Sequence, residues 1–275
     1  MSQIVRTILL CFTMCNRKAS VQTQQQKFKL TQNGQKQDSN FFRKGLIFME
    51  RMSRNTQSSI SNYLKDPASS ISHLIGTIMA FVAAFPLIAK ATRIGGLKAG
   101  SSMLVFCVSL ILLYLASTLY HGVISTDRIE RRLKKFDHMM VYALIAGTYT
   151  PVCTLVLGGK PGYTMLAAVW GIALVGMIIN AIWIYCPKWL NSLVYIAMGW
   201  VVVFAFRSVV AALNPTGFGW LLAGGIIYTV GGIIYALKLP LFNDRHQNFG
   251  THEIFHIFCI AGSMCHYILM YLYVL

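Results

Sequence analysis

The chain begins with a polar stretch and continues as a series of long apolar runs. From position 67 onward, seven runs contain no Asp, Glu, Lys or Arg, and the shortest of them has 18 residues: 67–89, 99–126, 138–159, 161–187, 189–206, 208–237 and 254–275. A helix needs about 20 apolar residues to cross the hydrocarbon core of a bilayer. The pattern therefore predicts an all-α integral membrane protein.

Glycine, proline and charged residues separate the runs and set the expected helix ends. We predict a seven-transmembrane helix bundle over 69–275, because a helix satisfies its own backbone groups in lipid. Four glycines in the sixth span (Gly224, Gly225, Gly231 and Gly232) predict close packing between helices. The expected spans are 69–89, 101–122, 138–157, 163–185, 190–212, 218–237 and 252–274.

Residues 1–68 form a separate segment that is basic and rich in Gln, Lys, Ser and Asn between positions 22 and 40. This composition has too few apolar residues to build a core, so we expect disorder there. The apolar patch at 8–15 is too short for a membrane span and resembles no signal peptide. Met49 and Met52 remain alternative starts of translation.

The formal net charge of +16 is concentrated in a few segments of the chain. Eleven of the 24 Lys and Arg residues precede position 68, and five more lie within 128–135, which is typical of loops held in the cytoplasm. With the N terminus inside, cytoplasmic segments hold 19 Lys and Arg residues against 5 outside. We predict a multi-pass plasma-membrane protein with its C terminus outside, and no nucleic-acid partner. The seven cysteines predict membrane-buried hydrophobic side chains and no disulfide framework.

Histidine placement indicates chemistry. His121 ends the second predicted span, Asp137 begins the third, and His252 and His256 begin the seventh, so all four face the cytoplasmic side. Residues four apart share a helix face, as Ser117 does with His121 and His252 does with His256. Three imidazoles can bind zinc and leave a fourth position open for water, as in catalytic sites. Asp137 is the candidate proton acceptor and Ser117 a candidate hydrogen-bonding neighbour.

Several alternatives stay open at this point. Interfacial histidines are common without a metal, and Asp137 at a helix start is a natural N-cap. Residues 252–256 also read as HExxH, in which Glu253 would be the general base of an intramembrane metalloprotease. His266 lies about 21 Å beyond His252 along a helix, and we expect it to form a hydrogen bond inside the bundle. His73 either faces the site or packs; His138 is expected to point elsewhere, and His246 to lie in a loop.

The motifs Ser117 to His121, Phe136-Asp137-His138 and His252 to His256 resemble the hemolysin III family, the bacterial branch of the progestin and adipoQ receptors. The resemblance covers about 69–275 and extends to a superfamily that includes alkaline ceramidases. It implies a seven-helix bundle with a cytoplasmic N terminus, zinc bound by the three histidines, and an acidic contact to the metal's water from Asp137. In adiponectin receptors the residue matching Glu253 is Gln, which argues against a required base there.

Together these features predict a zinc-dependent hydrolase of a lipid amide or ester bond at the cytoplasmic membrane face. Zinc would polarise the carbonyl and supply hydroxide, with Asp137 as base, while an apolar cavity would hold the acyl chain of a membrane lipid. The rival function is a non-enzymatic protein with structural zinc, either receptor-like or a pore-forming cytolysin. A pore needs a continuous polar lining, and the predicted spans carry almost no charge.

Overall fold

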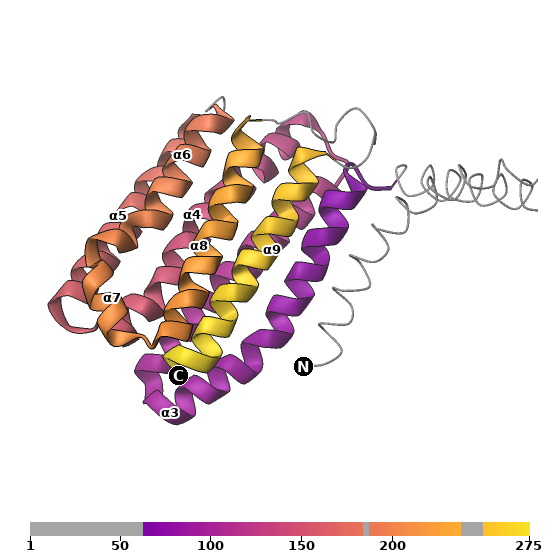
Figure 1. Cartoon of the computed structure of the whole chain (residues 1–275). Helices are drawn as coiled ribbons and strands as arrows, with labels where there is room; N and C mark the ends of the chain where they lie inside the picture. Colours follow the sequence, from indigo (N-terminus) through magenta and orange to yellow (C-terminus); the bar gives the residue numbers. More distant parts are fainter. Residues whose placement is uncertain (1–62, 184–186, 238–249) are drawn as a thin grey trace, which may run out of the picture. The chain divides into compact units, whose positions relative to one another are not determined.

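The computed structural model describes residues 63–183, 187–237 and 250–275, all within one compact unit that runs from Ser59 to Leu275. Within these ranges the chain is a bundle of helices (Figure 1). The predictions for residues 1–62, including the apolar patch and the alternative starts, lie outside the described residues. So does the loop expected around His246.

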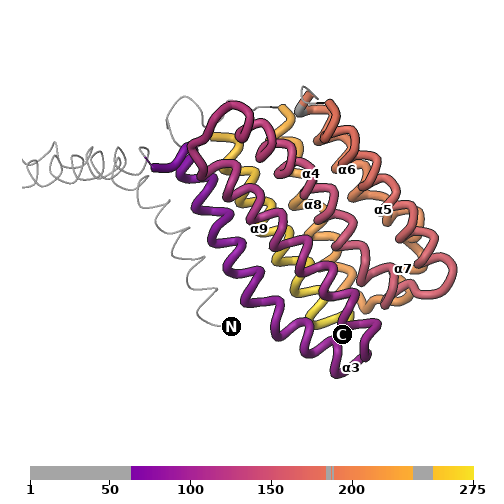
Figure 2. Tube along the Cα trace, turned by 180° about the vertical axis from the view of Figure 1, so that it is seen from behind, coloured from indigo at the N-terminus to yellow at the C-terminus, as the bar shows by residue number. Residues whose placement is uncertain are grey.

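The first described helix, α3 (Pro67–Gly122), contains two limbs joined by a sharp break. Pro67 opens it, in the first turn where a missing N–H costs nothing. Gly95 and Gly96 leave helical geometry, and Gly96 has φ of 63°, a left-handed conformation that favours glycine. The limbs run side by side (Figure 2). Their far ends meet where Ser70 Oγ donates to the carbonyl of Thr118 at 3.2 Å.

The remaining elements run back and forth along α3. Two of the expected spans end in π-helical turns and one is interrupted by a 3-10 segment. Their bounds are α4 (Asp127–Pro151), η2 (Val152–Leu157), α5 (Gly159–Ile182), α6 (Lys188–Gly199), η3 (Trp200–Ala205), α7 (Phe206–Ala212), α8 (Pro215–Leu237), α9 (Thr251–Leu269) and η4 (Met270–Val274).

Side chains satisfy backbone groups where the helices deviate from α geometry. Tyr149 on α4 bridges the break between α6 and η3: its hydroxyl donates to the carbonyl of Gly199 at 2.7 Å and accepts from the N–H of Val202 at 2.8 Å. Trp200 Nε1 donates to Thr229 Oγ1 on α8 at 2.9 Å. In lipid, unpaired backbone N–H and C=O groups cannot bind water, so these hydrogen bonds make an irregular segment tolerable at membrane depth.

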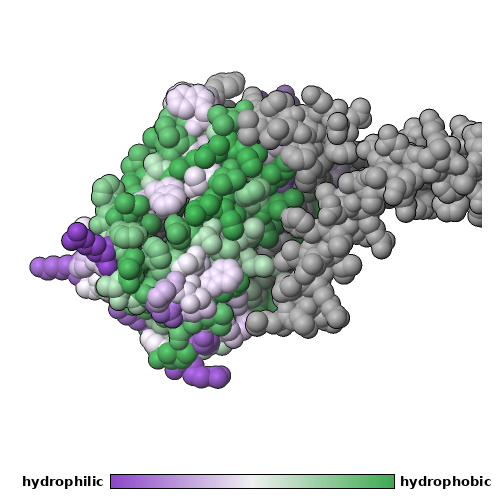
Figure 3. Space-filling view, in the orientation of Figure 1, coloured by the Kyte–Doolittle hydropathy of each residue, from purple (hydrophilic) through white to green (hydrophobic). Residues whose placement is uncertain are grey.

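The outside of the bundle is apolar. Figure 3 shows hydrophobic residues over most of the visible flank, and the exposed large side chains include Phe81, Phe85, Ile178, Leu193 and Phe204. Among the described residues, six helices have the length and composition to cross a membrane, and the first of them is the two-limbed α3. The predicted all-helical membrane architecture is confirmed to this extent.

Two details differ from prediction or refine it. Helix α4 begins at Asp127, not near 138, because the charged residues after position 127 form an amphipathic extension of the span. Asp137 therefore lies well inside the helix, and its reading as an N-cap is wrong. Gly224, Gly231 and Gly232 are buried as expected for close packing, whereas Gly225 is not buried and has open space beside it. The four described cysteines (Cys107, Cys153, Cys259 and Cys265) are buried and free.

Candidate metal centre

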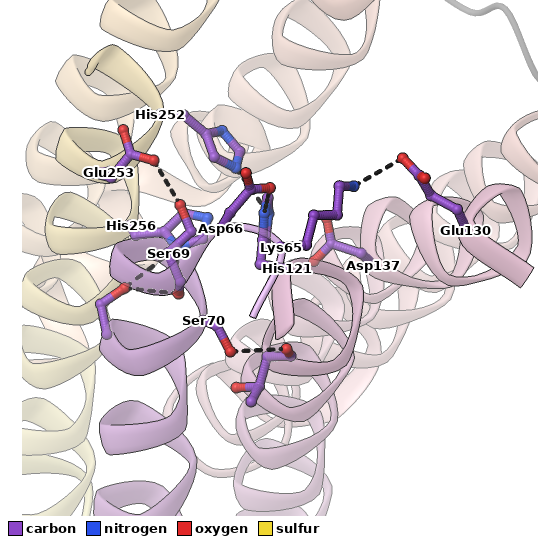
Figure 4. Close-up of polar contacts among 12 residues, drawn as sticks. Lys65, Asp66, Ser69, Ser70, His121, Glu130, Asp137, His252, Glu253 and His256 are labelled. Atoms are coloured by element: carbon purple, nitrogen blue, oxygen red, sulfur yellow. Dashed lines mark hydrogen bonds and ion pairs between the residues drawn. The ribbon is translucent and has the colours of Figure 1, made fainter. Parts of the chain in front are cut away.

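Three buried or half-buried histidines converge from two helices (Figure 4). His121 ends the second limb of α3, and His252 and His256 lie one turn apart at the start of α9. One ring nitrogen from each lies within 4.8 Å of the others. His121 Nε2 and His252 Nε2 are 2.9 Å apart. The predicted triad is thus brought together, and its members line up at one end of the bundle.

Oxygen atoms fix the orientation of two of these rings. Asp66 Oδ2 lies 3.0 Å from His121 Nδ1, and the carbonyl oxygen of Ser69 lies 3.3 Å from His256 Nδ1. A carboxylate and a carbonyl can only accept, so both histidines donate from Nδ1. The lone pair of each ring is then on Nε2, the atom that would bind a cation, which is the usual arrangement around a protein-bound metal.

This donor set fits zinc. Zn–N bonds of about 2.0–2.1 Å at tetrahedral angles place the ligand nitrogens about 3.3 Å apart. The observed 2.9 Å between His121 and His252 is within a small side-chain adjustment of that spacing. Three nitrogen ligands within 4.8 Å of one another leave a fourth tetrahedral position for a non-protein ligand.

The two residues predicted to act beside the triad, Ser117 and Asp137, line an internal cavity that His252 and His256 also line. Neither belongs to the group of three potential metal ligands. Ser117 is 1% exposed, one turn before His121. Asp137, 9% exposed, projects from α4 on the far side of His121 (Figure 4). Its Oδ2 lies 3.4 Å from His138 Nδ1, which also contacts the carbonyl of Lys134 at 2.9 Å. His138 was expected to point elsewhere, but it contacts Asp137 and lines the cavity.

The Glu253 carboxylate is engaged in local structure. Ser69 Oγ donates to Oε1 at 2.8 Å and the N–H of Gly250 donates to Oε2 at 2.7 Å. Glu253 therefore ties the start of α9 to α3, and in Figure 4 it points toward Ser69. Because both oxygens accept structural hydrogen bonds, the geometry disfavours Glu253 as the general base of an HExxH site.

His73 is a fourth histidine beside the triad. It is 2% exposed, and its ring stacks on His256 with centroids 3.6 Å apart and planes 9° apart. Tyr114 packs against it edge-on at 5.1 Å. Neither of its ring nitrogens has a hydrogen-bond partner among the described residues. His73 also lines the cavity, so of the two open readings the structure supports a place beside the site.

A cavity of about 380 Å³ opens from this cluster into the bundle. His73, Asp137 and His256 are among its polar lining residues, and most of the wall is apolar, including Leu113, Val141, Val209, Phe218 and Leu221. A cavity with this lining suits an apolar ligand.

His266 lines the same cavity from deeper on α9. We expected a hydrogen bond inside the bundle, but its Nδ1 is buried without a partner among the described residues. Its ring instead stacks on Tyr228, with centroids 5.4 Å apart.

Asp66 contacts the triad in a way that the sequence did not reveal. It immediately precedes Pro67, a position that predicts a helix cap, yet its side chain makes no cap bond and turns to His121 instead. The adjacent Lys65 binds Glu130 at 2.8 Å. Partial burial lowers the pKa of Lys65, but the hydrogen bond that Lys65 donates to Glu130 and the surrounding negative groups outweigh this effect and raise that pKa above its ordinary value.

The fold and the buried triad define a multi-pass membrane protein with a candidate metal centre. The model of the haemolysin-III related family matches residues 61–267. Hemolysin-3 of Bacillus cereus is 37% identical over 227 residues, which cover 82% of this chain and 97% of that protein. The Hemolysin-3 homolog of Bacillus subtilis (strain 168) is 37% identical over 196 residues, or 71% and 88% of the two chains. The chain belongs to the haemolysin-III related family.

A shorter similarity links the chain to receptors. The adiponectin receptor protein of Drosophila melanogaster is 36% identical over 58 residues, which are 20% of this chain and 13% of that protein. The predicted relationship to the hemolysin III and adipoQ receptor group is confirmed.

Proposed function

We propose that the protein is a zinc-dependent hydrolase that cleaves an amide or ester bond of a membrane lipid at the cytoplasmic face of the plasma membrane. The observation that carries the proposal is the position of the triad: three imidazole nitrogens lie within 4.8 Å of one another, and two of these histidines, His252 and His256, line a largely apolar cavity. A site for a metal and a space for an acyl chain are thus continuous.

The residues around the triad support a division of roles. Asp66 and the Ser69 carbonyl hold the rings of His121 and His256 with Nε2 available. A zinc ion bound there would polarise the scissile carbonyl and lower the pKa of its water to about 7. Asp137 would accept the proton of the attacking water and return it to the leaving amine or alcohol as the C–N or C–O bond breaks. Ser117 would form a hydrogen bond near the Asp137 carboxylate.

The membrane orientation belongs to the same proposal. Each limb of α3 would cross the membrane, since 67–94 and 97–122 flank the break at Gly95 and Gly96 and each is long enough to span it. Seven crossings with a cytoplasmic N-terminal segment would put the triad at the cytoplasmic face, where the basic first turns of α4 would follow the positive-inside rule.

The test compares metal content with turnover. Wild type, Asp137→Ala and His256→Ala are purified in detergent, assayed for zinc, and incubated with panels of lipid amides and lipid esters. Asp137→Ala should keep zinc and lose about 10²- to 10⁴-fold in turnover, because it removes the general base but no ligand. His256→Ala should lose both. A zinc-loaded wild type without turnover on any lipid, and an Asp137 variant that loses zinc and stability together, would favour a structural metal.

The name of the family raises a second candidate, a cytolytic pore. The described part of the cavity is lined mostly by apolar side chains, whereas a conducting path needs continuous polar groups. Dye-loaded liposomes test this directly: release on addition of the purified protein, independent of His256, would support the pore and not the hydrolase.

A further inference from the structure

The first turns of α4 carry charged residues that are sorted by helix face. At about 100° per residue, four cations fall within an arc of about 100° and form what we call the basic stripe: Arg128, Arg131, Arg132 and Lys135. The carboxylates of α4 fall within an arc of about 80° on another side of the helix, together with Lys134: Asp127, Glu130 and Asp137. The charges of this segment are therefore segregated, not interspersed.

The basic stripe is open to the surroundings. Arg128, Arg131 and Arg132 are all exposed, and among the described residues none of them forms an ion pair with a carboxylate. The nearby carboxylate of Glu130 turns the other way and accepts from Lys65 Nζ at 2.8 Å (Figure 4). Three guanidinium groups on one face thus lack an anionic partner within the described part of the chain.

The position of the basic stripe along α4 matches the depth of lipid headgroups. The charge-free part of the span begins at position 138, so Lys135 precedes it by about 5 Å of helix and Arg131 and Arg132 by about 9–11 Å. The headgroup region extends about 5–8 Å beyond the hydrocarbon on each side of a bilayer, and a long arginine side chain can reach back to it. Lys135 Nζ also donates to the carbonyl of Ala181 near the end of α5. Trp183, which follows α5, is 48% exposed, as is typical of an interfacial tryptophan.

A neighbouring face of the same turns is apolar and also exposed. Ile129 and Phe136 are 46% and 39% exposed, and with Leu133 they lie within an arc of about 60° that adjoins the basic stripe. Amphipathic helices that lie at a membrane interface combine a basic face with an apolar one in this way. A soluble anion has no use for the apolar face, whereas a phospholipid offers a phosphate and acyl chains together.

We propose that the basic stripe is a binding site for the phosphate of an anionic glycerophospholipid in the leaflet around this end of the bundle. Guanidinium groups bind phosphate oxygens through paired N–H bonds, and Ile129 and Phe136 contact the upper part of the acyl chains. The positive-inside rule requires cations in this region but not on one side of the helix. Their segregation from the carboxylates is what fits a ligand of defined position, and it holds whether or not the protein is a hydrolase.

Native mass spectrometry of the full chain measures the binding of individual lipids without any turnover. The protein in detergent is titrated with dioctanoyl phosphatidylglycerol and with dioctanoyl phosphatidylcholine, which share their chains and their phosphodiester but differ in net charge. One cation near an anionic surface strengthens binding about 5-fold, and salt screens part of this gain. For three arginines we expect phosphatidylglycerol to bind about 10-fold more tightly than phosphatidylcholine. Inorganic phosphate at the same concentration should not displace it.

Two variants of equal charge assign the preference to the basic stripe. Arg128→Gln/Arg131→Gln/Arg132→Gln should reduce the preference for phosphatidylglycerol to about 2-fold or less. The matched control removes the same charge from three exposed residues at the opposite end of the bundle and should keep the preference: Arg93→Gln/Lys160→Gln/Arg207→Gln. Melting temperatures establish folding. If the first variant is unstable, Arg131→Gln/Arg132→Gln should still lower the preference about 3-fold.

The outcomes distinguish a lipid site from general charge. Equal binding of the two lipids by the wild type, a preference that survives loss of the three stripe arginines, or an equal loss in the control variant overturns the site. Displacement of phosphatidylglycerol by inorganic phosphate shows a site for soluble anions and overturns the lipid assignment. A loss confined to the stripe variant supports the site even in a protein that hydrolyses no lipid, so this result and the proposed function stand or fall separately.

Discussion

Removing the Asp66 carboxylate should weaken zinc binding although Asp66 is not a ligand. Its Oδ2 accepts from His121 Nδ1 at 3.0 Å, which holds His121 in the tautomer with a free Nε2 and makes that nitrogen a better donor. Loss of such an outer contact typically costs 10- to 100-fold in metal affinity. The Asp66 side chain is 45% exposed, and water screens part of its effect. We therefore expect the lower end of the range, about 10-fold for Asp66→Ala, or about 1.4 kcal/mol.

The assay is competition for zinc between the purified protein and a chelator of known affinity. Asp66→Asn keeps an oxygen acceptor but not the charge, and should fall between the wild type and Asp66→Ala. Lys65→Ala is the matched control, because Lys65 precedes Asp66 in the same segment and binds Glu130, not a histidine. Its half-exposed ion pair contributes about 1 kcal/mol of stability or less, and zinc affinity should not change.

Two results would refute this reasoning. Unchanged zinc affinity in Asp66→Ala would show that the hydrogen bond does not orient His121 in the metal-bound protein. An equal loss of affinity in Lys65→Ala would show that both changes act by loosening the start of α3, in which case the contact between Asp66 and His121 has no specific role.

Three further outcomes follow from the geometry. His73→Phe should keep zinc and the stack on His256, and should raise the melting temperature or leave it unchanged, since it removes two unpaired nitrogens; a lower melting temperature would contradict it. Glu253→Gln should retain zinc and most turnover, because Glu253 binds α3 and Gly250, and loss of turnover with zinc in place would restore the HExxH reading. Gly224→Ala should destabilise the bundle by about 1–3 kcal/mol through contact with the His266 ring, whereas Gly225→Ala, with open space around it, should not, as chemical denaturation would measure.

The sequence predicted most of the fold because membrane helices have a simple determinant. Long runs without charge bounded by breakers placed α5, α8 and the continuous stretch of α9 and η4 within a few residues of their observed ends. The start of α4 was missed because hydropathy shows where the chain is apolar, not where it forms a helix. The charged residues after Asp127 extend the helix beyond its apolar part. A search for apolar runs does not take their helical propensity into account.

The triad could be predicted because two of its members share a helix face and the third ends an adjacent span. Spacing four residues apart is a local property, so His252 and His256 needed no tertiary information. Asp66 and His73 were not resolved, because their roles depend on how the limbs of α3 fold back on each other. That reversal at Gly95 and Gly96 brings Asp66 to His121 across 55 positions of sequence.

The relation between the triad and the cavity bears on whether a bound metal would be catalytic or structural. Structural zinc sites have four protein ligands and are closed, while catalytic sites keep one position for water or substrate. Among the described residues the cluster offers three nitrogens, and His252 and His256 both form part of the cavity wall, together with Asp137 and Ser117. A fourth position directed at that cavity would meet the head of a bound lipid. The proposed hydrolase requires such an arrangement, whereas a structural metal would gain nothing from facing an apolar cavity that costs packing.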